Sequence, residues 1–173
     1  MSLPRDESGG PSRKMRLYLI RHAHAVAADE DAERPLSQKG REQVKRLANF
    51  FKSSEAFQPD EIWHSPLRRS LQTAKLLAKK LECAVPLVEV EGLEPEDDAR
   101  ATALRLTSLR CDVAIVGHEP HLSALASELI AKGPATSAFV LRKSSVLALE
   151  RSRGRRGSTW SVRWQVSPEL LSA

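Results

Sequence analysis

Two histidines and two arginines lie at positions from which they could act together on a phosphoryl group. Arg21 and His22 directly follow a short apolar run of the chain. Arg69 lies shortly after a second run, and His118 follows a later one. Side chains that follow the strands of an open α/β sheet line the crevice where ligands bind. A guanidinium suits phosphate oxygens, and an imidazole beside such cations stays neutral and nucleophilic near pH 7. The four residues therefore predict chemistry on a phosphoryl group.

The elements expected to position these residues alternate between short apolar runs and amphipathic stretches, as in an α/β protein. The apolar runs predict strands over residues 15–20, 61–64, 85–90 and 112–116. The amphipathic stretches predict one helix after Ser37, one after Ser65, and two more over 99–109 and 121–131. Ser37 is a favoured helix cap, because its hydroxyl accepts a backbone N–H. The helices that begin after Ser65 and His118 could direct further N–H donors at the same anion.

The pattern changes toward the carboxyl end, where three further strands are predicted over 138–141, 145–150 and 159–166. An arginine-rich and glycine-rich turn, residues 151–156, is expected to join the last two strands and to be solvated. The predicted fold is a three-layer α/β/α sandwich with a mostly parallel central sheet and an antiparallel C-terminal edge.

Length and composition indicate one globular domain. The chain has 173 residues, of which 41% are hydrophobic, which is enough for a real core and argues against a disordered chain. Residues 1–14 are polar and predict a disordered tail, so the domain is expected over 15–173 in a cytoplasmic protein. The net charge of +5 is concentrated in the first residues and in the arginines of 151–156, so no nucleic-acid or membrane partner is expected. A monomer is expected, because no dimerisation signal is evident.

Four segments, in order along the chain, resemble the landmarks of the histidine phosphatase superfamily. They read LIRHA at 19–23, RPLSQKG at 34–40, SPLRRSLQTA at 65–74 and VGH at 116–118. The short chain, the RPL segment and the GHEP sequence at 117–120 look most like the small bacterial phosphohistidine phosphatases of that superfamily. The resemblance covers about residues 15–166, nearly the whole expected domain.

The resemblance implies a role for each of the four residues. His22 would be the nucleophile that is transiently phosphorylated, with Arg21 beside it in the phosphate pocket. Arg69 would be the second phosphate ligand, with Arg68 at the variable position, and His118 would contact the phosphoryl oxygens. The implied enzyme uses neither a metal nor another cofactor, and its expected substrate is a phosphohistidine on a protein.

Two departures from the family pattern leave alternatives open. Ala23 stands where the commoner motif has glycine. Many relatives also place a proton donor after the third strand, where this chain has six candidates, Glu89, Glu91, Glu94, Glu96, Asp97 and Asp98. An imidazole leaves more readily than an alkoxide and needs such an acid less, which favours phosphohistidine. Small sugar-phosphate-like monoesters remain the alternative substrates, and an inactive phosphoprotein-binding module is the non-enzymatic alternative.

Several other polar residues have simpler interpretations. The spacing of His22 and His24 can suit zinc, but the barrel hydrolases that use it need about 250 residues, so His24 is expected at the rim of the pocket. His64 is expected to be structural. Arg34 could reach an acidic substrate or be a solvated charge, and both interpretations remain open.

Overall fold

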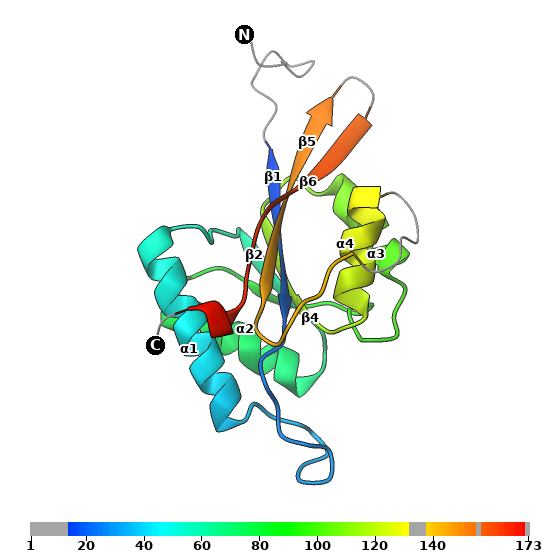
Figure 1. Cartoon of the computed structure of the whole chain (residues 1–173). Helices are drawn as coiled ribbons and strands as arrows, with labels where there is room; N and C mark the ends of the chain where they lie inside the picture. The colour runs from blue at the N-terminus through cyan, green and yellow to red at the C-terminus, as the bar shows by residue number, and fades with distance from the viewer. Residues whose placement is uncertain (1–13, 132–137, 155–156, 172–173) are drawn as a thin grey trace.

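The computed structural model describes residues 14–131, 138–154 and 157–171. A six-stranded sheet in the order β3-β2-β4-β1-β5-β6 forms its centre (Figure 1). The four strands β3, β2, β4 and β1 run parallel, whereas β5 and β6 are antiparallel to their neighbours. Their bounds are β1 Met15–Arg21, β2 Glu61–His64, β3 Leu87–Glu89, β4 Val113–Gly117, β5 Val146–Gly154 and β6 Gly157–Val166. The predicted fold class is confirmed.

The central strand β1 contributes side chains to both faces of the sheet. Leu17 and Leu19 point into one apolar core, and Tyr18 and Ile20 point into the other. This alternation follows from the two-residue period of a strand. All four side chains are at most 1% exposed, so β1 is buried on both faces. A strand that is buried on both faces has a continuous run of apolar residues. This explains why residues 15–20 form an apolar run in the sequence.

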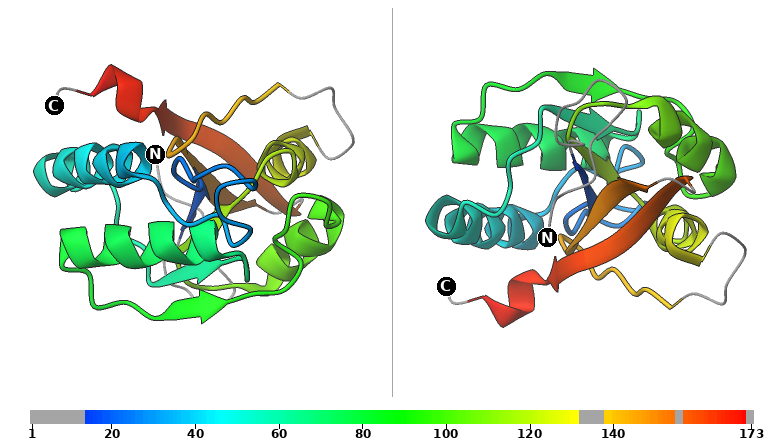
Figure 2. Two further views of the ribbon diagram at one scale, coloured as in Figure 1. Left: turned by 90° about the horizontal axis from the view of Figure 1, so that it is seen from below. Right: turned by 90° about the horizontal axis from the view of Figure 1, so that it is seen from above.

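Two pairs of helices cover the two faces of the sheet (Figure 2). On one side lie α1, Gln38–Ser54, and α2, Arg68–Leu81, whose apolar faces join the core that contains Tyr18. On the other lie α3, Ala99–Ser108, and α4, His121–Ala131, which join the core that contains Leu17. A short 3-10 helix, η1 Pro168–Leu170, follows β6. The three layers therefore match the predicted sandwich.

The start of α1 is held in place by Ser37 and Gly40. The Ser37 hydroxyl accepts the Gly40 N–H at 3.2 Å, so the predicted cap is confirmed. Gly40 also packs directly on the backbone that follows the first strand, because a Cβ at this position would lie 2.1 Å from the His24 carbonyl oxygen. The RPLSQKG segment thus brings α1 against the chain just beyond His22.

Two sequence predictions at the carboxyl end are wrong. Residues 138–141 form no strand; β1 already has β4 on one side and β5 on the other, and this segment instead offers the Leu141 carbonyl to Arg21 Nη1 at 2.8 Å. Arg151 is not part of a solvated turn. It lies in β5, is 3% exposed, and donates to the Leu106, Thr107 and Leu109 carbonyls at the end of α3.

Two other predictions concern residues that the structure does not describe. The predicted disordered tail, 1–14, lies outside the described residues except for its last position, and so does the arginine pair 155–156.

Candidate active site

The carboxyl ends of β1 and β4 lie side by side and present two histidines to each other. The His22 N–H donates to the Gly117 carbonyl at 2.9 Å, which fixes the chain just beyond both strands. The centroids of the His22 and His118 rings are 5.0 Å apart, with an interplanar angle of 49°. Residues 96 positions apart in the sequence are thereby brought into contact, as the strand order requires.

The His22 side chain has a defined orientation. It is 6% exposed, and its Nδ1 lies 2.7 Å from the Ala23 carbonyl oxygen. A carbonyl can only accept a hydrogen bond, so a neutral ring must carry its proton on Nδ1. The lone pair of the neutral ring is then on Nε2. This is the tautomer that a nucleophilic histidine needs.

The pKa of His22 is lowered from 6.5 to about 3. The largest cause is burial, which penalises the charged ring, and the charges of His118, Arg69 and Lys143 lower it further. Sequence reasoning gave the right direction but emphasised the wrong cause, because it considered the arginines and not the loss of water. His22 is therefore neutral throughout the physiological pH range.

His118 is equally enclosed. It is 1% exposed, and its Nε2 lies 2.6 Å from the Ser65 hydroxyl, at the end of β2. Its Nδ1 is buried and has no partner among the described residues. Burial, followed by the charge of Arg69, lowers the pKa of His118 to about 3. A neutral ring with one nitrogen bound to Ser65 leaves Nδ1 as the group available to a ligand.

The charges of both predicted arginines add to burial in lowering the pKa of His118. Arg69 lies in the first turn of α2, half-buried, and its Nε is buried without a partner in the described part of the chain. Arg21 donates from Nη1 to Leu141, and its Nε is likewise unpartnered. Arg68, at the variable position of the motif, is exposed. Both guanidinium groups thus retain donors for an anion.

Ala23, where the commoner motif has glycine, is fully buried and fits without disturbance. Its N–H donates to the Thr73 hydroxyl at 3.0 Å, and that hydroxyl donates to the Arg69 carbonyl at 2.7 Å. The backbone beyond His22 is therefore connected directly to the turn that carries Arg69.

The other histidines take different positions. The Nδ1 of His24, which is half-buried, lies 2.7 Å from the Ser37 hydroxyl. His64 is 3% exposed and its Nδ1 lies 2.9 Å from the Ser65 carbonyl oxygen, consistent with a structural residue. Arg34 is half-buried, and its charge adds to burial in lowering the pKa values of Arg69, His118 and His24.

The six candidate carboxylates separate into groups. Glu89, Glu91, Glu96 and Asp98 are exposed; Asp98 caps α3 by accepting from the Arg100 N–H, and Asp97 accepts from the Glu94 N–H at 2.7 Å. Glu94 is half-buried, and its charge raises the pKa of Arg69. Of the six, Glu94 is thus the carboxylate linked electrostatically to the arginines.

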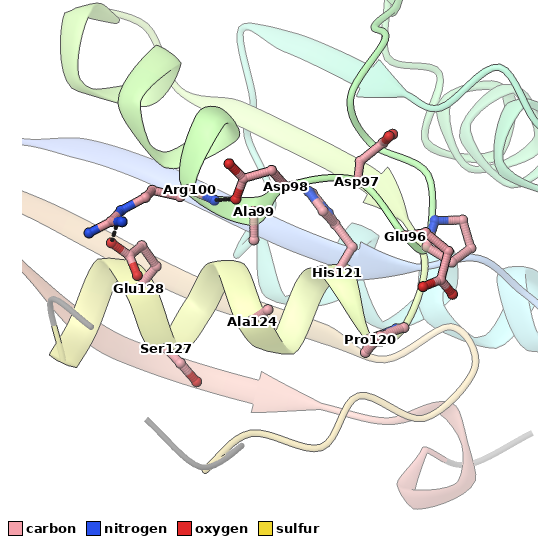
Figure 3. Close-up of a pocket in the computed structure, with 11 residues that line it drawn as sticks. Glu96, Asp97, Asp98, Ala99, Arg100, Pro120, His121, Ala124, Ser127 and Glu128 are labelled. Carbon is pink, nitrogen blue, oxygen red and sulfur yellow. Dashed lines mark hydrogen bonds and ion pairs between the residues drawn. The ribbon is translucent and has the colours of Figure 1, made fainter. Parts of the chain in front are cut away.

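A groove of about 490 Å³ lies beside the site, between α3 and α4 (Figure 3). Glu96, Asp97 and Asp98 line one part of it, and Glu128 lies farther along, near Arg100. Acidic side chains line this groove, whereas the charges that act on His22 are positive, so these carboxylates belong to a separate surface.

Sequence reasoning missed two groups. Glu119 is half-buried and accepts from the Ser123 hydroxyl, while its other oxygen is buried without a partner among the described residues. Burial raises its pKa, and Arg21 partly opposes this effect. Lys143, in the turn before β5, acts electrostatically on His22. Glu119 lies within the GHEP sequence at 117–120, which is a signal, but nothing in the sequence around Lys143 indicates that the turn reaches the site.

Within the described ranges, no cluster of three or more His, Cys, Asp or Glu side chains could hold a metal ion. The same part of the chain contains no helix with the length and apolar character needed to cross a membrane.

Comparison with known proteins confirms the resemblance seen in the sequence. The sequence model of the histidine phosphatase superfamily (branch 1) matches residues 17–95. No curated protein sequence matches the chain.

Solved structures share the fold. The protein histidine phosphatase SixA, complexed with tungstate, has a TM-score of 0.76 and 23% identity, and the match covers 90% of this chain and 99% of that one. A protein assigned as the phosphohistidine phosphatase SixA of Agrobacterium tumefaciens has a TM-score of 0.70 and 22% identity, with 91% and 100% covered. The alpha-ribazole phosphatase of Shigella flexneri has a TM-score of 0.67 and 20% identity, with 86% and 95% covered.

Proposed function

Given this resemblance, we propose that the chain is a phosphatase in which His22 is the nucleophile and a protein phosphohistidine is the substrate. The observation that carries the proposal is the state of His22: a buried, neutral ring whose Nδ1 is bound to the Ala23 carbonyl, so that Nε2 carries a free lone pair. An unprotonated nitrogen among cations is suited to attack a phosphorus atom whose oxygens those cations bind.

The proposed reaction has two steps. In the first, His22 Nε2 attacks phosphorus, an N–P bond forms, and the bond between phosphorus and the substrate imidazole breaks. The leaving imidazole nitrogen takes a proton from water. In the second, water attacks the phosphoryl group, the bond to Nε2 breaks, and inorganic phosphate leaves with His22 restored. The proton released from this water neutralises the hydroxide left by the first step.

The two arginines and His118 would stabilise both steps. Arg21 and Arg69 have unpartnered Nε–H donors, and His118 has an unpartnered Nδ1, so each can bind an equatorial phosphoryl oxygen. Donors fixed before the reaction need no reorganisation as charge develops, and loss of one commonly reduces the rate about 10²–10³-fold. No metal is needed for this chemistry, because the protein itself supplies the positive charge.

The names of similar solved structures support a phosphohistidine substrate. Two of the similar structures are named as histidine or phosphohistidine phosphatases, and one of them binds tungstate, a tetrahedral oxyanion like phosphate. The four pocket residues are all present and convergent, which argues against an inactive binding module.

Small phosphomonoesters are the second candidate, supported by the alpha-ribazole phosphatase among the similar structures. An alkoxide leaving group needs a proton donor. Glu119 and Glu94 are the carboxyl groups linked electrostatically to the arginines, and the raised pKa of Glu119 favours its protonated form.

The test is capture of the phosphorylated intermediate. The chain is mixed with a ³²P-phosphohistidine protein and, separately, with a ³²P-labelled sugar phosphate, and quenched in alkali within one turnover. We expect label on the wild-type chain that is stable in alkali and lost in acid, and no label on His22→Ala. His24→Asn is the matched control, because Asn can retain the hydrogen bond to Ser37, and it should be labelled normally.

Labelling of folded His22→Ala at the wild-type level would refute the nucleophile. Faster labelling by the sugar phosphate than by the phosphohistidine protein would favour the monoester alternative.

A further inference from the structure

The turn that contains Lys143 is attached to the backbone of the proposed nucleophile. The Ser144 N–H donates to the Arg21 carbonyl at 3.0 Å and to the His22 carbonyl at 3.4 Å, and the Arg21 N–H donates to the Ser145 carbonyl at 3.1 Å. Arg21 Nη1 also binds Leu141 at 2.8 Å. Four hydrogen bonds therefore hold residues 141–145 beside Arg21 and His22, although the two segments are 120 positions apart.

The turn has a defined shape that presents Lys143. The Ser145 N–H donates to the Arg142 carbonyl at 2.9 Å, which places Lys143 and Ser144 at the corner. Ser144 has a φ of 60°, in the left-handed region that a non-glycine residue adopts only under constraint. It is fully buried, so the rest of the turn fixes this conformation. The base of the Lys143 side chain is thus held in one place.

The charges around Lys143 are all of one sign. Its pKa is lowered by burial and then by Arg21, Arg34, Arg69 and Lys39. Lys143 in turn lowers the pKa values of His22 and His24. Within the described part of the chain the Lys143 ammonium has no hydrogen bond or ion pair. Half-buried cations close to one another repel unless an anion joins them.

We propose that Lys143 is a further substrate-binding residue of this site, whose ammonium binds the same phosphoryl group as Arg21 and Arg69. The inference rests on the proposed function, because it assigns Lys143 to the same oxyanion. An ammonium on a flexible stem can follow the phosphoryl group as it moves between donor and acceptor, which a planar, fixed guanidinium does less readily.

The adjacent residue provides a contrast. Arg142 lies in the same turn, but its side chain is 71% exposed and it pairs with Glu169 at 3.4 Å. An exposed ion pair of this kind contributes little to the free energy of unfolding. Arg142 therefore supplies a control that changes the charge of the turn without touching the pocket.

The test measures binding of inorganic phosphate by isothermal titration calorimetry at 0.15 M salt, where exposed charges are screened beyond about 8 Å. The full chain is compared with Lys143→Gln, Lys143→Arg and Arg142→Gln. We expect Lys143→Gln to raise the Kd of phosphate about tenfold or more, as for loss of one charged hydrogen bond. Lys143→Arg and Arg142→Gln should remain within threefold of the wild type.

Three results would overturn the inference. They are an unchanged Kd for Lys143→Gln, an equal loss in Lys143→Arg, which would assign the effect to the turn and not to the charge, and an equal loss in Arg142→Gln. A wild-type chain that binds no phosphate would overturn the proposed function itself. A phosphorylated His22 together with unchanged binding by Lys143→Gln would refute only the role of Lys143.

Discussion

Acidification should destabilise this protein through the same two histidines that form the pocket. His22 and His118 have pKa values of about 3 in the folded chain and 6.5 as the ordinary value. Between these pH values the unfolded chain binds protons that the folded chain does not. The free energy of unfolding therefore falls as the pH falls through this window, and the contribution of each histidine is fully present only above about pH 6.5.

The magnitude follows from the two pKa values. At pH 5 an exposed histidine is mostly protonated, and linkage gives a loss of about 2 kcal/mol per histidine relative to pH 7.5. Together the pair would remove about 4 kcal/mol, a large share of the 5–15 kcal/mol that stabilises a typical domain. His121, whose pKa is also lowered by burial, acts in the same direction.

The assay is urea unfolding followed by circular dichroism at pH 7.5 and pH 5, in buffers without phosphate or sulfate. Other groups also titrate, so the informative quantity is the difference between wild type and His22→Gln. Between pH 7.5 and pH 5, the free energy of unfolding of the variant should fall by about 2 kcal/mol less than that of the wild type. An equal loss in both proteins would show that His22 is not held neutral by the fold, and the argument for its nucleophilic state would fail.

Two further predictions concern the scaffold. Gly40→Ala would place a methyl group 2.1 Å from the His24 carbonyl oxygen, so α1 must shift; we expect a lower Tm and weaker phosphate binding, and an unchanged Tm would refute the close approach. Arg151→Met would leave the carbonyls at the end of α3 without their donors and should reduce the free energy of unfolding by about 1–3 kcal/mol in urea titrations, whereas the exposed Arg153→Met should change it by less than about 0.5 kcal/mol.

The convergence of the pocket could be predicted because it depends on local patterns. Apolar runs mark β1, β2 and β4, and the residues that follow them must meet at one edge of a parallel sheet. The start of α1 could be predicted from an equally local pattern, because Ser37 precedes an amphipathic stretch and caps the helix that this stretch forms. Sequence patterns alone therefore predict that His22, Arg69 and His118 lie together.

The rest depends on contacts between distant segments. Lys143 reaches the site only because its turn binds the backbone of Arg21, and Arg151 is buried only because β5 passes the end of α3. Residues 138–141 have strand-like composition, but both sides of β1 are taken by other strands. Neither residue type nor spacing signals such arrangements.

The hydrogen bond from His22 to Ala23 is local, yet the burial that keeps the ring uncharged is not. It requires β4, α2 and the turn before β5 to close around a ring near the start of the chain. While the later segments are still missing during synthesis, His22 is an ordinary, partly protonated histidine with no cations facing it. If His22 is the nucleophile as proposed, a growing chain does not yet carry it in its reactive state, because the neutral ring arises only when the last segments are in place.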